Sequence, residues 1–277
     1  MFFKQQQSSM LKGDEIAQER LNKLRGHITG KELSLSVVKV GDHKVSSSYI
    51  RKKQEAADFI GVRFDVRQFP DSISQFSLIN EIRAIIESEV NACIVQLPLP
   101  TAIRSQDVLD AISVEKDADL LSSGAFGKFA LGTSKILPPT VKAVSIALEK
   151  AGVQLKGTRI ALVGTGRLVG LPLAVWLMRE GATVLTANEY TENVTEITKS
   201  ANVVISGVGK PNLINPSMVT NGVVLIDAGT SVEQGQARGD IDPRAFKKAA
   251  FYSPVPGGIG PLTVACLLEN VVELAKR

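Results

Sequence analysis

The sequence predicts an α/β protein of two domains, and three observations lead to this fold class. Strand patterns alternate with helical patterns along the first third of the chain, which favours a mainly parallel sheet. The alternation pauses at Leu-Pro-Pro, residues 137–139. A second series then opens with an apolar strand, a glycine-rich turn and a helix, as in a Rossmann-type domain. We therefore expect an N-terminal α/β domain over 1–138 and a Rossmann-type dinucleotide-binding domain over 139–261, with a cleft between them.

The first domain is expected to repeat a strand-helix unit. Serines 46 to 48 stand where a helix N-cap belongs, and Gly61 is typical of a helix C-terminus. Ligands of parallel sheets bind at the carboxyl ends of the strands, where Gln96 falls. Tyr49 and Asp119 lie in segments that can fold beside it. The expected elements are a helix over 12–23, a strand over 33–40, a helix over 49–60, a strand over 62–68, a helix over 74–89 and a strand over 92–97.

The second domain is expected to begin at the pause over 137–139, with a helix that Thr140 caps and that runs to Ala151. Its pattern is that of a nucleotide-binding half-fold. The last helix, starting at Pro261, follows a glycine-proline loop and has no strand after it, so we expect 262–277 to pack back on the first domain. The other expected elements are strands over 159–163, 183–187, 203–206 and 223–227 and a helix over 169–180.

Composition restricts the classes of partner. The net charge of +4 and the isoelectric point near 9.0 suit an anionic partner, but the basic residues are scattered and aromatic residues make up only 5%. This argues against nucleic acid, and an anionic small molecule explains the charge equally well. The N-terminus lacks a signal-peptide core and no apolar run reaches membrane-spanning length, so we expect no membrane partner.

Cysteine and histidine usage points to a reduced, metal-free protein. Cys93 and Cys266 lie far apart within apolar runs, which is typical of free core cysteines and indicates a cytoplasmic location. The chain has two histidines and neither a cysteine cluster nor a paired-carboxylate motif. A metal site built from the protein is therefore not expected.

The glycine-rich turn predicts a dinucleotide site. Gly164 can make the tight turn, and Gly166 lets backbone amides approach a diphosphate that the helix N-terminus stabilises. Thr165 and Arg167 belong to the same turn. The third glycine, Gly170, comes one residue later than in G-x-G-x-x-G. A turn needed only for close packing of strand and helix is the alternative.

Two residues argue in opposite directions on the cofactor, which leaves NAD and NADP both open. Glu189 follows the next strand at roughly the ~20-residue spacing where a carboxylate accepts hydrogen bonds from ribose hydroxyls, which favours NAD. Arg167 can attract the 2′-phosphate of NADP. An exposed loop carboxylate is the plainer interpretation of Glu189. Thr230 is a further candidate for cofactor binding.

Three segments together go beyond a generic dinucleotide fold: Tyr49-Ile50-Arg51-Lys52-Lys53, Val95-Gln96-Leu97-Pro98-Leu99-Pro100, and Ser253-Pro254-Val255-Pro256-Gly257-Gly258-Ile259-Gly260-Pro261-Leu262-Thr263. The chain resembles the bifunctional methylenetetrahydrofolate dehydrogenase/methenyltetrahydrofolate cyclohydrolase family. The resemblance runs in order from about Leu11 to the C-terminus. It implies a homodimeric enzyme that acts on tetrahydrofolate derivatives with NAD or NADP.

The resemblance also implies roles for individual residues. Lys53 matches the catalytic lysine, and Gln96 matches the glutamine that hydrogen-bonds it and tunes its protonation. Tyr49, four residues before Lys53 on the same helix face, orients the folate rings. Asp119 anchors the pterin, whose N–H donors suit a carboxylate. A backbone wall close to the substrate is expected from Pro256, Gly257 and Gly258.

Each of these residues taken alone has a plainer interpretation, such as a solvated lysine or a turn aspartate. Their joint occurrence in family order favours the enzyme. The chain also departs from the family, with Thr165 in the phosphate turn and Leu120 where the family commonly has glycine. Two alternatives therefore stand beside the bifunctional enzyme: a monofunctional NAD-linked dehydrogenase, and a catalytically silent protein that binds folate or nucleotide.

Overall fold

The computed structural model describes residues 8–42, 44–233 and 236–276. The chain forms two compact units. The three-stranded unit comprises Ala17–Pro139 together with the residues from Val264 onward. The six-stranded unit comprises Thr140–Thr263 together with the N-terminal residues up to Ile16. This is the predicted two-domain α/β fold, while the predicted cleft stays a prediction.

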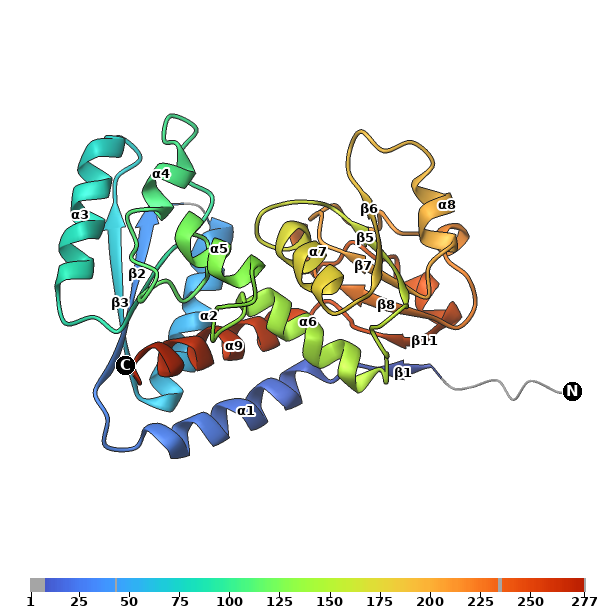
Figure 1. Cartoon of the computed structure of the whole chain (residues 1–277), viewed down its shortest axis with the longest axis horizontal. Helices are drawn as coiled ribbons and strands as arrows, with labels where there is room; N and C mark the ends of the chain where they lie inside the picture. The colour runs from blue at the N-terminus through green and yellow to red at the C-terminus, as the bar shows by residue number, and fades with distance from the viewer. Residues whose placement is uncertain (1–7, 43, 234–235, 277) are drawn as a thin grey trace, which may run out of the picture. The chain divides into compact units, whose positions relative to one another are not determined.

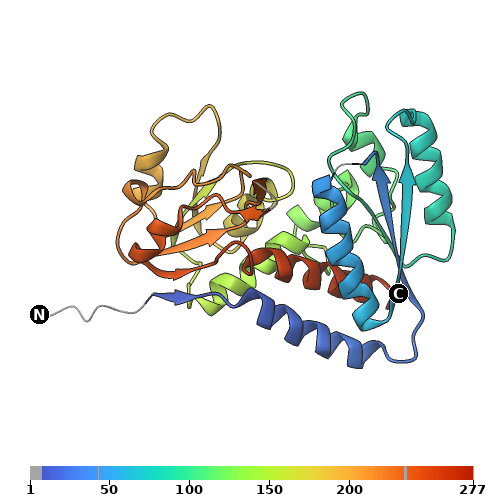
Figure 2. The same cartoon turned by 180° about the vertical axis from the view of Figure 1, so that it is seen from behind.

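The three-stranded unit is built on a parallel sheet in the order β3-β2-β4. Its strands are β2 (Leu33–Val40), β3 (Val62–Phe69) and β4 (Ala92–Val95). Two helices, α2 (Lys44–Ile60) and α3 (Gln75–Glu87), cover opposite faces of the sheet (Figures 1 and 2). Every residue of β2 is buried, as a central strand covered on both faces requires.

Short helices and two long ones complete this unit. The side chains of Ser74 and Ser122 cap α3 and α5 by accepting hydrogen bonds from backbone amides. The long helices α1 and α9 each contribute residues to both units. The bounds are α1 (Gly13–Ile28), α4 (Ser105–Leu109), α5 (Ser123–Ala130) and α9 (Ile259–Leu274).

The six-stranded unit contains a parallel sheet in the order β1-β11-β8-β7-β5-β6. From β5 the chain adds β6 on one side and then crosses to add β7 on the other, so the strand order reverses between β5 and β7. Ligands of open parallel sheets bind at such a switch point. The strands are β1 (Ser9–Met10), β5 (Arg159–Val163), β6 (Thr183–Ala187), β7 (Val203–Ser206), β8 (Val223–Asp227) and β11 (Ala249–Tyr252).

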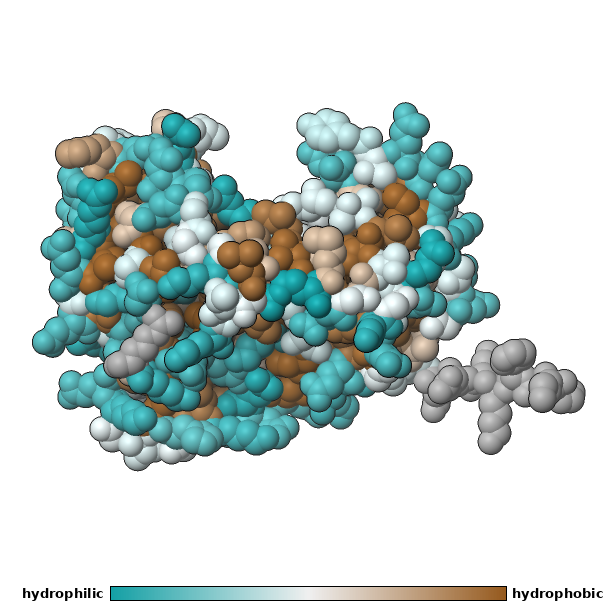
Figure 3. Space-filling view, viewed as in Figure 1, coloured by the Kyte–Doolittle hydropathy of each residue, from teal (hydrophilic) through white to brown (hydrophobic). Residues whose placement is uncertain are grey.

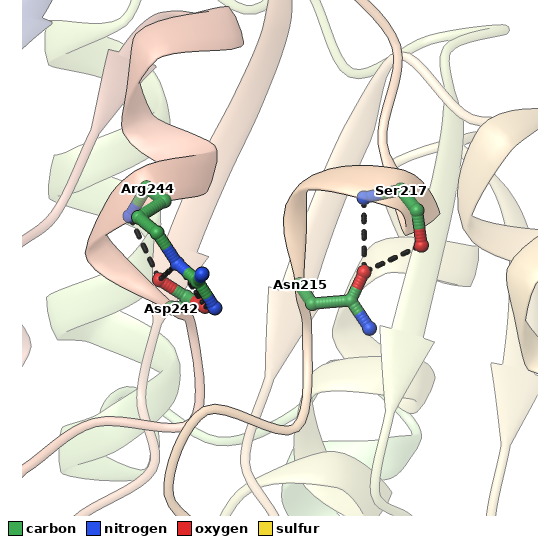
Figure 4. A network of polar contacts seen from close by, with 4 residues as sticks. All are labelled: Asn215, Ser217, Asp242 and Arg244. Carbon is green, nitrogen blue, oxygen red and sulfur yellow. Dashed lines mark hydrogen bonds and ion pairs between the residues drawn. The ribbon is translucent and has the colours of Figure 1, made fainter.

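Helices and a hairpin surround this sheet. Two short helices have polar caps, because Asn215 accepts from the backbone of Ser217 and Asp242 accepts from that of Arg244 (Figure 4). The guanidinium of Arg244 also holds the pKa of Asp242 below its ordinary value. The bounds are α6 (Pro139–Lys150), α7 (Gly170–Arg179), α8 (Val194–Lys199), η1 (Pro216–Met218), η2 (Pro243–Lys248), β9 (Ser231–Glu233) and β10 (Gln236–Arg238).

The predicted strands over 33–40, 159–163, 183–187, 203–206 and 223–227 match the structure, and two predicted helix starts are wrong. The helix α2 begins at Lys44, so Ser47 and Ser48 lie within it and do not cap it. The helix α6 begins at Pro139, because proline suits the first helical position, and Thr140 is already inside. Strand β11 was not predicted, because its sequence, Ala-Ala-Phe-Tyr, has none of the β-branched residues that mark the predicted short strands.

The surface is mixed in character. Hydrophilic and hydrophobic residues are interspersed over the face shown in Figure 3. The exposed large apolar side chains include Phe76 and Leu131. In the described part of the chain, none of the helices combines the length and apolar character that crossing a membrane needs.

Candidate active site

The three-stranded unit brings two predicted site residues, Lys53 and Gln96, together at its own switch point, where β2 lies between β3 and β4. Gln96 directly follows β4, and its backbone N–H donates to the carbonyl oxygen of Val38 in β2 at 2.8 Å. Its side chain amide donates to its neighbour Leu97, which orients the amide oxygen. Lys53 Nζ, from α2, donates to that Oε1 at 3.1 Å. The lysine and the glutamine therefore form one hydrogen-bonded pair.

The helix α2 carries both Tyr49 and Lys53, one turn apart on the same face. Its first turns are tied to the sheet by Lys39, a buried residue of β2. Lys39 Nζ donates to Asp42 Oδ1 at 2.9 Å and to Ser47 Oγ at 3.0 Å. These hydrogen bonds restrict where the helix can place its functional side chains. Lys39 was not predicted from the sequence, because a polar residue that alternates with apolar ones in a strand is usually exposed.

Asp119 lies in an irregular segment between Asp117 and the helix α5. The side chain of Asp117 closes this segment, because its Oδ2 accepts the N–H of Ser122 at 2.8 Å. Directly after Asp119, Leu120 is buried and has φ of 56°, a conformation that L-residues adopt at a cost. In the family that this chain resembles, the position of Leu120 is commonly glycine, the residue that tolerates this backbone conformation.

Lys53 and Asp119 interact electrostatically across this site. Burial lowers the pKa of Lys53, and the negative charge of Asp119 opposes that shift. Burial likewise raises the pKa of Asp119, and the positive charge of Lys53 opposes it. A lowered pKa increases the fraction of neutral amine, which is the form of lysine that can act as a general base.

The six-stranded unit presents the glycine turn at the carboxyl end of β5. Gly164 has φ of 92°, which favours glycine, and a side chain there would also meet the backbone of Gly207 after β7. A Cβ on Gly170 would overlap the carbonyl oxygen of Gly164. The late third glycine therefore lets α7 approach the turn closely, the role that the third glycine has in dinucleotide-binding turns.

The middle of the turn is open. A Cβ on Gly166 would have no heavy atom within 4 Å, and Thr165 and Arg167 are exposed beside it. The helix α7 begins at Gly170, and its first turn lies against this glycine turn, because the N–H of Leu171 donates to the carbonyl oxygen of Gly166 at 3.0 Å. The positive N-terminal end of the helix is therefore close to this space. The turn therefore fits the diphosphate of a dinucleotide, which needs an unobstructed backbone at a helix N-terminus.

Glu189 stands at the carboxyl end of β6, beside the glycine turn. The N–H of Gly164 donates to the carbonyl oxygen of Ala187 at 2.8 Å, which links the two strand ends. Asn188 uses its side chain oxygen to accept from the backbone of Tyr190 at 3.0 Å. This local turn leaves the Glu189 carboxylate exposed at the edge of the sheet.

The loops after β7 and β8 are held by two buried aspartates that the sequence analysis missed. Asp240 accepts from Ser206 Oγ at 2.8 Å, from the N–H of Val208 at 2.7 Å and from the N–H of Lys210 at 2.9 Å. Asp227 accepts backbone N–H groups at both of its carboxylate oxygens. Burial, with the nearby charge of Asp240, raises the pKa of Asp227 to about 7.

The remaining predicted residues also follow strands of this sheet. Thr230 lies in the loop after β8, and Pro256, Gly257 and Gly258 follow β11. A Cβ on Gly258 would overlap the carbonyl oxygen of Pro254, so contacts within the segment already require this glycine. Packing within the chain thus accounts for Gly258 without a ligand.

Comparisons with known proteins agree with this arrangement. A family model described as the tetrahydrofolate dehydrogenase/cyclohydrolase catalytic domain matches residues 11–119, and one described as its NAD(P)-binding domain matches residues 138–277. The chain belongs to the tetrahydrofolate dehydrogenase/cyclohydrolase family. A curated relative from Geobacillus thermodenitrificans, the bifunctional protein FolD, is 38% identical over 267 residues, which cover 95% of this chain and 92% of the relative.

Solved structures of this family share the fold. The bifunctional methylenetetrahydrofolate dehydrogenase/cyclohydrolase FolD from Campylobacter jejuni has a TM-score of 0.92 at 32% identity, covering 97% of this chain and 99% of that chain. The Trypanosoma brucei enzyme, solved with NADP and an inhibitor, has a TM-score of 0.92 at 32% identity, covering 98% of each chain. The dehydrogenase/cyclohydrolase family thus accounts for both units of this chain.

Proposed function

We propose that this protein oxidises 5,10-methylenetetrahydrofolate to the 5,10-methenyl compound with NAD or NADP and hydrolyses the product to 10-formyltetrahydrofolate. The observation that carries this proposal is the hydrogen bond from Lys53 to Gln96, with Asp119 close enough to influence the lysine electrostatically. A silent binding protein has no need of a partly buried lysine whose pKa is lowered. The retained lysine also favours two activities over the dehydrogenase alone.

Substrate binding is assigned to the three-stranded unit. The Asp119 carboxylate accepts hydrogen bonds from the amino and ring N–H groups of the pterin, a charge-assisted arrangement. Tyr49, one helical turn from Lys53, orients the ring system, so the one-carbon group reaches the lysine. The segment of Pro256, Gly257 and Gly258 supplies backbone at the substrate, a role that remains a proposal.

The oxidation step relies on alignment by the protein. Acceptance of a hydride from the methylene carbon is the chemistry that a nicotinamide cofactor would supply. The diphosphate end would be held at the start of α7 by Gly164, Thr165, Gly166 and Arg167, and Thr230 would contribute from the loop after β8. Asp240 fixes the loop after β7 through its bonds to Val208 and Lys210.

The hydrolysis step uses Lys53 as a proton carrier. Water attacks the methenyl carbon, and the neutral amine of Lys53 takes the proton that the water releases. The resulting ammonium returns that proton to the ring nitrogen as its bond to the carbon breaks, and the added hydroxyl loses its remaining proton to solvent, which leaves the formyl group on the other nitrogen. Gln96 holds Nζ in place through both stages, because its amide oxygen accepts from the amine and the ammonium alike.

Oligomeric state and location follow from the family resemblance. We propose that the protein is a cytoplasmic homodimer that binds tetrahydrofolate derivatives. Cys93 and Cys266 are both buried thiols, and thiols persist in a reducing compartment. Light scattering coupled to gel filtration measures the mass: twice 29.7 kDa supports the dimer and a single chain contradicts it.

The activity is tested by following absorbance during oxidation of 5,10-methylenetetrahydrofolate, with NAD and with NADP in parallel. Turnover with either dinucleotide supports the dehydrogenase, and its absence with both contradicts it. Hydrolysis is assayed separately on 5,10-methenyltetrahydrofolate. We expect Lys53→Met to slow it by about 100-fold or more while folate binding persists. Lys52→Met is the matched control, because Lys52 is an exposed neighbour on the same helix.

A further inference from the structure

The segment that carries Asp119 has no regular secondary structure, so its shape depends on a few hydrogen bonds. It begins at an isolated bridge between Cys93 and Asp117. At its far end Ser122 donates its N–H to Asp117 and caps the helix α5. The left-handed backbone of Leu120 lies between these ends, and such a conformation persists only where its surroundings hold it.

One side chain from far along the sequence reaches the middle of this segment. Asn270 of α9 is fully buried, and its Nδ2 donates to the carbonyl oxygen of Ala118 at 2.9 Å. The same nitrogen donates to the carbonyl oxygen of Leu137 at 2.8 Å. Both donors of one amide are therefore used on backbone carbonyls, and one of these belongs to the residue just before Asp119.

We propose that Asn270 is a positioning residue for the folate anchor Asp119, an inference that rests on the pterin-binding role proposed above. The hydrogen bond to Ala118 fixes the peptide plane next to Asp119, and the bond to Leu137 fixes the amide itself. A buried carbonyl that loses its donor must find another, which the segment achieves only by changing shape. Asn270 acts on folate affinity through Asp119 without touching the substrate.

The charges around the segment are consistent with this division of roles. Burial raises the pKa of Asp117 to about 6, so its carboxylate is costly to keep ionised. Asp117 nevertheless accepts the hydrogen bond from Ser122, and the uncharged Asn270 supplies a second hydrogen bond that fixes the segment. A neutral amide donates at any pH, so the hydrogen bond from Asn270 to Ala118 does not depend on pH.

The test measures tetrahydrofolate binding by calorimetry and the kinetics of methylenetetrahydrofolate oxidation. Asn270→Ser removes both long donors with little added strain, and Asn270→Asp keeps the shape but replaces the donor nitrogen by oxygen. We expect either variant to weaken folate binding by about tenfold and to raise the folate KM equally, with kcat and the nucleotide KM within about twofold. Val271→Ala, a buried neighbour on α9, controls for general loosening of the helix.

A second arm separates failure of this inference from failure of the proposed function. Asp119→Asn should weaken folate binding on its own, and unchanged affinity in that variant overturns the role proposed for Asp119. If Asp119→Asn weakens binding but neither Asn270 variant does, the positioning role is overturned while the proposed function stands. In the double variant we expect Asn270→Ser to add less than twofold, because its effect passes through Asp119. Full additivity, or an equal loss in Val271→Ala, also overturns the positioning role.

Discussion

The two units share one plan and use it differently. Each has a parallel sheet whose strand order reverses, between β2 and β4 in one unit and between β5 and β7 in the other. At the first switch point the functional groups are side chains, with Lys53 bonded to Gln96. At the second, two positions with no room for a side chain are glycine, Gly164 and Gly170, so the turn presents its backbone.

This difference corresponds to two tasks. Proton transfer needs a titratable side chain held in a partly buried place, since burial shifts its pKa toward neutrality. Diphosphate binding needs backbone N–H groups and a helix N-terminus with nothing in front of them. The structure thus separates the group that does chemistry from the surface that holds a cofactor, and substitutions should affect the two activities separately.

The largest difference between the effect on dinucleotide use and the effect on hydrolysis is expected at Gly170. A methyl group there would overlap the carbonyl oxygen of Gly164, so Gly170→Ala forces α7 away from the turn. We expect kcat/KM for the dinucleotide to fall by about 100-fold, equivalent to about 3 kcal/mol. Hydrolysis of methenyltetrahydrofolate, assayed without dinucleotide, should stay within a few-fold of the parent. Equal losses in both assays would show that the two tasks are not separable.

Gly166 supplies the matched comparison for this prediction. Its Cβ position is open, so Gly166→Ala should leave the melting temperature within about 2 °C, as surface substitutions usually do. Nucleotide binding should nevertheless weaken, because the methyl group occupies the space assigned to the diphosphate. Calorimetric titration with NAD and NADP measures the effect, and unchanged binding of both would contradict that assignment.

Much of this arrangement could be predicted from local sequence. The strands of the six-stranded sheet follow from short apolar runs between turn residues, and the glycine turn follows from its spacing. Lys53 and Gln96 were paired through motifs that resemble a known family. The helix start at Lys44 was missed because serines resemble an N-cap wherever they precede an apolar pattern, and only the fold decides which turn is first.

The parts that could not be predicted depend on contacts between distant residues. Asp240 reaches the loop after β7 from 30 to 34 residues away, and Asn270 reaches Ala118 from 152 residues away. In the sequence these are a polar residue in a loop and one in a helix, with no period or motif around them. Their roles appear only when the fold brings backbone groups to them.

The next effect contrasts Asp117 with Asp227, one buried carboxylate from each unit. Burial raises the pKa of Asp117 from its ordinary 3.8 to about 6 and that of Asp227 to about 7. In both cases the folded state favours the protonated form, so the free energy of unfolding should fall as pH rises from about 4 to about 7. Urea unfolding across this range measures the trend, and a flat profile would contradict both shifts.

Amide replacements should distinguish the two aspartates. Asp117 uses Oδ2 as an acceptor while its Oδ1 has no hydrogen-bond partner among the described residues, so asparagine fits and removes a buried charge. We expect Asp117→Asn to raise the free energy of unfolding by about 1 to 3 kcal/mol at pH 8. Asp227 accepts hydrogen bonds at both oxygens, so the amide nitrogen of an asparagine there would face a donor. We therefore expect Asp227→Asn to lower the free energy of unfolding by about 1 to 3 kcal/mol. Changes of the same sign would refute this contrast.

A smaller effect is expected at Gln96. Glutamate there places a carboxylate beside Lys53 Nζ, which raises the pKa of the lysine and leaves less neutral amine at pH 7. We expect the pH profile of hydrolysis to move upward by about one unit, which slows the reaction by about tenfold at neutral pH. Gln18→Glu, on the exposed face of α1, controls for the change in net charge. A slower reaction with an unmoved profile would mean that Gln96 does not tune the lysine.

The smallest effect concerns the choice of dinucleotide. Glu189 is exposed at the end of β6 and repels a 2′-phosphate, whereas Arg167 in the glycine turn attracts one. Exposed charges contribute little, so we expect Glu189→Gln to raise the ratio of kcat/KM for NADP over NAD by about threefold to tenfold. Arg167→Gln should lower the same ratio by a similar factor. The ratio is best measured at low and at high salt, because an electrostatic effect shrinks as salt screens it. If neither substitution moves the ratio, discrimination comes from the shape of the turn, and the cofactor preference of this unit depends on backbone as its diphosphate binding does.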